Sequence, residues 1–147
     1  MRRLPLWLLP PALWVGYAAG AHVFTLTAIR RGPRGARRVA LTFDDGPDPV
    51  HTPKVLDLLV DAGVRGTFFV VGERAAGAPD LVREMAARGH EVENHTWSHG
   101  NLWLRGPGAT EREIVRTHEV VHDLTGRPPR FFRPPGGRVN LAVFPPL

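Results

Sequence analysis

Apolar and polar residues follow two alternating patterns from Val39 onward. Short runs rich in β-branched and aromatic residues predict buried strands, and stretches with apolar residues three or four positions apart predict helices between them. The predicted strands are residues 38–43, 65–72, 90–95 and 130–137, and the predicted helices are 52–63, 79–89 and 110–126. Strands that alternate with helices through short connections favour parallel pairing, so the sequence predicts an α/β fold.

Residues typical of helix ends mark two of the predicted helices. Thr52 is expected as the N-cap of the first, with Pro53 at its first helical position. The last helix is expected to open with a capping box of Thr110 and Glu113 and to end at Gly126.

The N-terminal part has a different pattern. Residues 4–29 are 26 consecutive positions without a charged side chain, which exceeds the roughly 20 apolar residues that a membrane-spanning helix needs. We therefore expect an anchor within residues 1–29 and a basic linker at 30–38. An A-x-A pattern that ends at Ala21 also permits a cleaved signal peptide. We favour the anchor, because the apolar stretch continues beyond Ala21.

Positive charge is concentrated before the predicted folded part. The chain carries 19 basic and 14 acidic residues, but residues 1–38 hold seven Arg and no acid. From Val39 onward 12 basic residues stand against 14 acidic ones, so a nucleic-acid partner is not expected. Cysteine is absent, which excludes disulfides and thiolate metal sites.

Two adjacent carboxylates stand at the end of the first predicted strand, in the stretch VALTFDDGPD. Asp44 and Asp45 disfavour each other's ionisation unless a cation or a proton-transfer role offsets the repulsion. The pair therefore predicts either a bound cation or a proton-transfer role at this position.

Two histidines follow the third predicted strand, in the stretch ENHTWSHGN. The carboxyl ends of parallel strands meet at one end of a sheet, so His95 and His99 should lie near Asp45. Two imidazoles and one carboxylate suit a catalytic divalent ion, with zinc as the default. His118 and His122 have the same spacing on a predicted helix, where we expect only solvated side chains.

Three motifs in this order resemble those of the polysaccharide deacetylases of the NodB homology type, carbohydrate esterase family 4. They are TFDDGP at 42–47, HTWSH at 95–99 and RPPGG at 133–137. The resemblance covers about residues 38–140, and it implies a distorted (β/α) barrel. Residues 39–147 would then form part of such a deacetylase domain.

The resemblance also implies a role for each matching residue. Asp44 would be the catalytic base, and Arg133 would orient it and pair with its charge. The turn at Pro135 and Gly136 would face the oxyanion, although the family usually has an aromatic residue at Gly136, so this change affects sugar stacking. The implied metal ligands, for zinc or alternatively cobalt, are Asp45, His95 and His99.

The same resemblance implies hydrolysis of N-acetyl groups on a peptidoglycan-like or chitin-like glycan. The family's last two motifs, which include a Leu-x-His that supplies the general acid, have no counterpart, because the sequence ends at NLAVFPPL. We therefore expect a barrel that is incomplete at its C-terminus. The alternative to an active enzyme is a vestigial, membrane-tethered fragment that binds glycan without turnover.

Two arguments about the membrane side of the domain disagree. Five Arg follow the apolar stretch and two precede it, which favours a cytoplasmic domain. A glycan substrate requires the outside, and long domains translocate largely regardless of charge. We therefore expect an extracytoplasmic domain anchored through residues 4–29, or secreted after signal cleavage.

Overall fold

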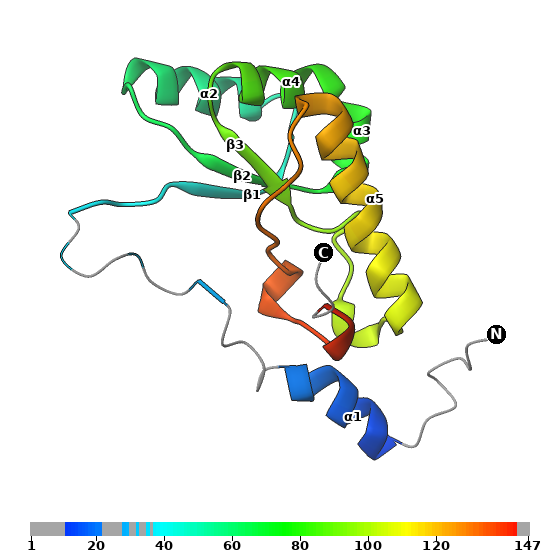
Figure 1. Ribbon diagram of the computed structural model, residues 1–147. Helices are drawn as coiled ribbons and strands as arrows, with labels where there is room; N and C mark the ends of the chain where they lie inside the picture. Colours follow the sequence, from blue (N-terminus) through cyan, green and yellow to red (C-terminus); the bar gives the residue numbers. More distant parts are fainter. Residues whose placement is uncertain (1–10, 22–27, 30–31, 33–34, 36, 144–147) are drawn as a thin grey trace.

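A three-stranded parallel sheet organises the fold. The computed structural model describes residues 11–21, 28–29, 32, 35 and 37–143. The strands run in the order β1 (Thr42–Gly46), β2 (Thr67–Val70) and β3 (Glu91–Asn94). Phe43 pairs with Phe68, and Phe68 with Val92, so all three carboxyl ends lie at the same end of the sheet (Figure 1). The predicted parallel α/β fold is confirmed, whereas these strands do not close a barrel, which stays a prediction.

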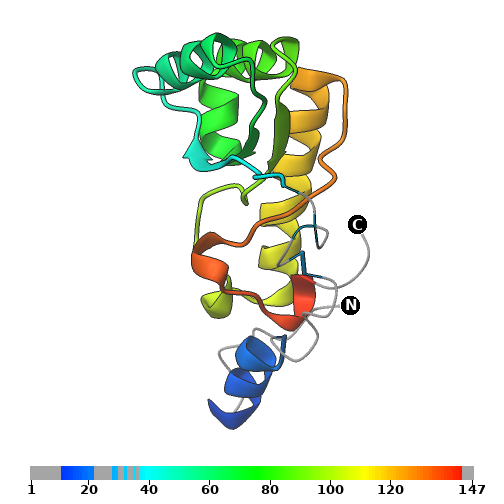
Figure 2. The ribbon, with the colours of Figure 1, turned by 90° about the vertical axis from the view of Figure 1, so that its left-hand side faces the viewer.

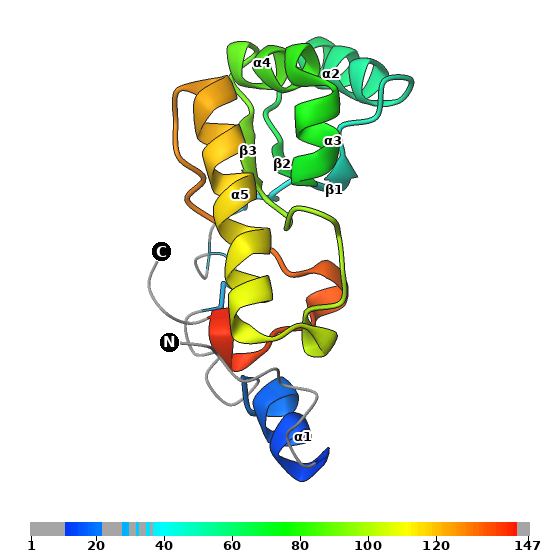
Figure 3. The ribbon, with the colours of Figure 1, turned by 90° about the vertical axis from the view of Figure 1, so that its right-hand side faces the viewer.

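Helices pack mainly on one side of this sheet. Figure 3 shows α3 and α5 in front of the strands, with α2 and α4 beside each other at the end farthest from α1. Figure 2 shows the molecule from the opposite side, where its outline is elongated. The helices are α1 (Pro11–Gly20), α2 (Thr52–Asp61), α3 (Gly72–Gly77), α4 (Pro79–Ala87) and α5 (Pro107–Thr125), with short 3-10 turns η3 (Leu102–Leu104), η4 (Pro135–Gly137) and η5 (Leu141–Val143).

Helices α2, α3, α4 and α5 contribute apolar side chains to the core. On α2, Leu56 and Leu59 are buried while Leu58 and Val60 are exposed, as an amphipathic helix requires. Burial of each such side chain stabilises the fold by about 1.5–3 kcal/mol. The core consists of Leu56, Leu59, Phe68, Val70, Ala75, Val82, Met85, Val92 and Val121.

Two predicted helix starts are wrong. The N-cap of α2 is His51, and the Thr52 hydroxyl instead accepts the backbone N–H of Asp48 at 2.8 Å. Helix α5 begins three residues before Thr110, because Pro107 provides a favourable first position after Gly106. Thr110 therefore lies inside the helix, and no capping box forms there. The predicted end is confirmed, since Gly126 caps α5 in the left-handed conformation.

The predicted fourth strand, residues 130–137, is also wrong. Only one parallel bridge forms, between Asn94 and Phe132. Proline has no backbone N–H to donate, so Pro134 and Pro135 prevent the ladder from continuing beyond Arg133. The chain turns into η4 instead.

The N-terminal segment is described only in part. Helix α1 covers ten residues of the predicted anchor, and the rest of residues 4–29 lies outside the described residues except for 21 and 28–29. None of the helices in the described ranges is long and apolar enough to cross a bilayer. The anchor stays a prediction, as does the linker at 30–38.

Candidate metal centre

A β-bulge at the end of β1 positions the first candidate ligand. Asp44 pairs with Phe69 and Gly46 with Val70, so Asp45 is the extra residue between two regular pairs. Its φ is +67°, in the left-handed region. Successive side chains of a regular strand point to opposite faces, whereas a bulge redirects one of them. The irregularity therefore allows two consecutive carboxylates to serve the same end of the sheet.

His95 follows β3 directly and is almost fully buried. Its backbone N–H donates to the carbonyl of Val70 at 3.0 Å, which ties it to β2. Its Nδ1 lies 2.7 Å from the carbonyl oxygen of Arg133. Because a carbonyl only accepts, Nδ1 carries the proton and Nε2 keeps a free lone pair. This is the arrangement that metal-binding histidines usually have.

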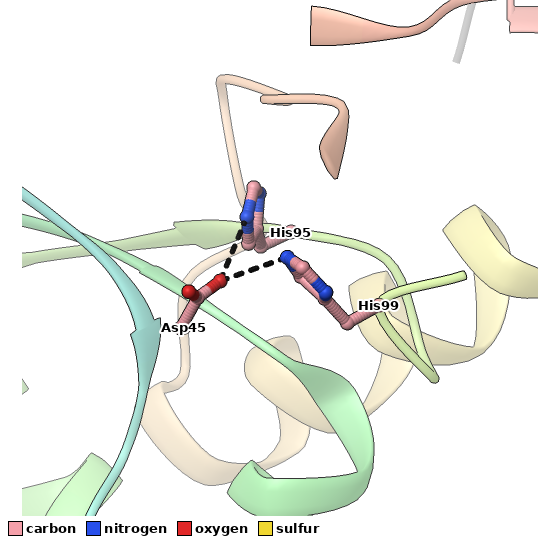
Figure 4. A group of neighbouring side chains, drawn as sticks. All are labelled: Asp45, His95 and His99. Atoms are coloured by element: carbon pink, nitrogen blue, oxygen red, sulfur yellow. Dashed lines mark ion pairs between the residues drawn. The ribbon is translucent and has the colours of Figure 1, made fainter. Parts of the chain in front are cut away.

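His99 reaches the same point from the loop after β3. Its side chain is 43% exposed, and its φ is +56°. The Nε2 of His99 lies 2.9 Å from Oδ1 of Asp45, and the Nε2 of His95 lies 3.2 Å from the same oxygen. Figure 4 shows both rings directed at this carboxylate.

These three side chains fit one divalent ion. One ligand atom from each lies within 4.8 Å of the other two. Two atoms that bind the same zinc ion at about 2.0–2.2 Å in tetrahedral geometry lie about 3.3 Å apart, close to the observed distances. Two imidazoles and one carboxylate leave coordination positions for water and substrate. The structure therefore brings Asp45, His95 and His99 together as expected.

Asp44 and Arg133 form an ion pair next to this cluster. The Arg133 Nη1 lies 2.5 Å from Oδ1 of Asp44 and donates to the Thr42 hydroxyl at 3.0 Å. The guanidinium carbon also lies 4.0 Å from the centre of the Phe69 ring. Two hydrogen bonds and one stacked face fix the arginine, so it can orient the carboxylate.

Pro135 and Gly136 lie two and three residues after Arg133, in η4. Among the described residues, no hydrogen bond or ion pair connects them to the three candidate ligands. Pro135 is buried and has no N–H, so only Gly136 could donate to an oxyanion. Their role stays a prediction.

The sequence gives no signal for three residues that support the cluster. Arg74 on α3 donates to the backbone carbonyl of Asp45. Asn94 accepts the N–H of Thr96 at 2.9 Å. Glu113 on α5 binds the loop between the two histidines. Only the three-dimensional packing shows these contacts. Helix α3 is too short to be predicted from the sequence, and Glu113 fits the pattern of a capping box with Thr110.

The fold and the site together define a class: α/β proteins with two histidines and one aspartate at the carboxyl ends of parallel strands. The family model for polysaccharide deacetylase matches residues 31–145. The chain therefore belongs to the polysaccharide deacetylase family.

Several relatives are similar to large parts of the chain. A peptidoglycan-N-acetylglucosamine deacetylase of Bacillus cereus is 44% identical over 74% of this chain and 39% of its own length. A chitooligosaccharide deacetylase of Sinorhizobium fredii is 46% identical over 65% of this chain and 45% of its own. The chain thus spans less than half of these two relatives.

A solved relative supports the fold. The family 4 acetyl xylan esterase of Clostridium thermocellum, in complex with a cobalt ion, matches with a TM-score of 0.68 and 40% identity. The match covers 71% of this chain and 52% of that structure.

Proposed function

We propose that this chain carries the metal site and the catalytic base of a deacetylase that removes N-acetyl groups from an acetamido-sugar polysaccharide. The observation that carries the proposal is the convergence of Asp45, His95 and His99 beside the Asp44–Arg133 ion pair. Zinc suits the two nitrogen ligands and one oxygen ligand, and cobalt is the alternative.

The two neighbouring aspartates have different tasks in this proposal. A divalent ion bound by Asp45, His95 and His99 would supply a Lewis acid that polarises the acetamide carbonyl and acidifies water. Asp44 accepts the proton of the attacking water. Arg133 pairs with Asp44 and keeps its carboxylate oriented, and the N–H of Gly136 is the donor proposed for the oxyanion.

The proposed substrates are peptidoglycan-like or chitin-like glycans. Support comes from the names of the two relatives, one a peptidoglycan-N-acetylglucosamine deacetylase and the other a chitooligosaccharide deacetylase. The second candidate is a glycan-binding protein without turnover. Such a protein would use the same cluster of Asp45, His95 and His99 to hold an ion and a glycan without hydrolysing it.

Hydrolysis and metal content should separate the two aspartates. With N-acetylglucosamine oligomers and added zinc or cobalt, Asp44→Asn should lower acetate release by about 10²–10⁴-fold, because it removes the base. Its metal content should stay near that of the unmodified chain. Asp45→Asn should lose both acetate release and bound metal. Metal loss in Asp44→Asn but not in Asp45→Asn would reverse the roles, and metal binding without acetate release in the unmodified chain would favour the glycan-binding candidate.

We also propose that the domain faces the outside of the cell, anchored through residues 4–29 or secreted after signal cleavage. The support is the uncharged stretch and the proposed wall-type substrate. Protease added to intact cells should digest a tag placed after Leu147. A tag that stays protected until the membrane is lysed would place the domain inside.

A further inference from the structure

The loop between the two histidines has an unusual backbone. Thr96 and His99 have φ values of +70° and +56°, which residues other than glycine rarely adopt and which the surrounding structure must hold in place. At the start of α3, the N–H groups of Gly72 and Glu73 donate to the carbonyls of Thr96 and Trp97 at 2.9 and 3.0 Å. This fixes only the first half of the loop.

A buried acid on α5 holds the second half. The Glu113 side chain is 7% exposed, and its two oxygens accept the N–H and the hydroxyl of Ser98, each at 2.8 Å. Arg105 lies 3.0 Å from the same carboxylate and donates to the Ser98 oxygen at 2.9 Å. The carboxylate is therefore both neutralised and fully engaged, which a buried charge requires.

His99 depends on this support more than His95 does. His95 is buried and its Nδ1 is fixed by a backbone carbonyl. In the described part of the chain, only Asp45 makes a hydrogen bond or ion pair to a ring nitrogen of His99. Its ring is therefore oriented through its backbone. Arg105 packs so closely against Gly100, the next residue, that a Cβ there would collide with the guanidinium.

We propose that Glu113 is a positioning residue for the metal centre. It holds Ser98, and through Ser98 it keeps His99 in the conformation that binds the ion, while Arg105 balances its charge. This inference rests on the proposed metal site and adds to it a residue that touches neither ion nor substrate. Replacing Glu113 should therefore weaken metal binding although every ligand is intact.

Titration of the full chain with Co²⁺ tests this proposal. In Glu113→Gln one acceptor oxygen becomes an NH₂ group that faces either the Ser98 N–H or Arg105, so Co²⁺ affinity should fall by about 10–100-fold. The visible absorption bands of bound Co²⁺ should change as His99 moves. Ser98→Ala should change affinity and spectrum in the same direction. The double variant should lose less than the sum of the two single changes, because both act on one contact.

Glu119→Gln is the matched control, since Glu119 is exposed on the same helix, and it should bind Co²⁺ like the unmodified chain. A folded Glu113→Gln with unchanged affinity and spectrum would overturn the proposal, as would an equal loss in Glu119→Gln. If Glu113→Gln does not fold by circular dichroism, Ser98→Ala decides, and unchanged Co²⁺ binding there overturns the proposal. An unmodified chain that binds no Co²⁺ would remove the metal site itself and this inference with it.

Discussion

Two pairs of histidines with the same spacing have different surroundings in this molecule. After β3, His95 and His99 both direct Nε2 at Asp45, with ring centres 5.1 Å apart. On α5, His118 is half-buried, with an Nδ1 that has no hydrogen-bond partner among the described residues. His122 is exposed and lies 4.0 Å from a neighbouring carboxylate. Spacing alone therefore does not make a metal site.

The difference lies in what faces each pair. Residues four apart on a helix share one face, so the α5 pair already meets the spacing requirement. Among the residues that the structure describes, no third ligand from another element completes a cluster with that pair, whereas the bulge in β1 brings Asp45 to the pair after β3. Within the described ranges, Asp45, His95 and His99 are the one group of three potential ligands that converges. The expectation for the α5 pair is confirmed for His122 and wrong for His118, which is not fully solvated.

Removing one histidine from each pair gives the largest expected difference. His95→Ala should lose most of the stoichiometric metal, a greater effect than the 10–100-fold or so that loss of a supporting contact causes. His118→Ala should keep it, because in the described part of the chain the α5 pair belongs to no group of three potential ligands. Metal analysis of both purified variants after equal exposure to zinc measures this. Equal metal content in the two variants would show that the pair after β3 is not the site.

The sequence predicts which side chains of the candidate site lie together, for a physical reason. Parallel strands end together, so polar residues just after two strands meet at the same end of the sheet. This rule brings Asp45 and His95 together. The contact between Arg133 and Asp44 was implied by the resemblance, and the structure contains it.

The features that the sequence does not reveal depend on long-range contacts. The bulge at Asp45 leaves no mark in the alternation of residues. Glu113 satisfies the pattern of a capping box, but its carboxylate instead binds Ser98, 15 positions earlier in the chain. The fourth strand fails because one bridge at Phe132 is not extended by the prolines that follow.

Gly72 starts α3 and packs between helix α5 and the loop that joins His95 to His99, and it offers a smaller test. A Cβ at Gly72 would lie 2.5 Å from Oγ1 of Thr117 on α5 and 2.6 Å from Cε3 of Trp97, in the loop between His95 and His99. Gly72→Ala should therefore lower the free energy of unfolding by about 1–3 kcal/mol through overpacking. Gly77→Ala, at the other end of α3, has open space at its Cβ and should cost nothing. Urea unfolding curves compare them, and equal midpoints would show that α3, the loop and α5 are not tightly packed.

The smallest expected effect concerns His90, which stands just before β3 as His95 stands just after it. His90 is buried, its Nδ1 accepts the N–H of Gly66 at 3.2 Å, and its ring packs edge-on against Phe68. Burial lowers the pKa of His90, and the positive charges of Arg88 and Arg65 lower it further. Among the described residues, no carboxylate pairs with the His90 ring in the way that Asp45 pairs with His95.

The sign of the pH effect follows from this lowered pKa. Below an ordinary pKa of about 6.5 the unfolded chain binds a proton that the folded His90 resists, so stability falls as pH decreases, by at most about 1.4 kcal/mol per pH unit. His90→Asn keeps an acceptor for Gly66, but it loses the ring contact with Phe68 and should therefore be less stable at pH 7.5. Because asparagine cannot titrate, the variant should lose less stability on acidification. Urea midpoints of metal-free protein at pH 7.5 and 5.5 measure the difference. If the urea midpoints of both proteins decreased equally, His90 would take up its proton as easily in the folded protein as in the unfolded chain. Burial would then not distinguish His90, before β3, from His95, after it.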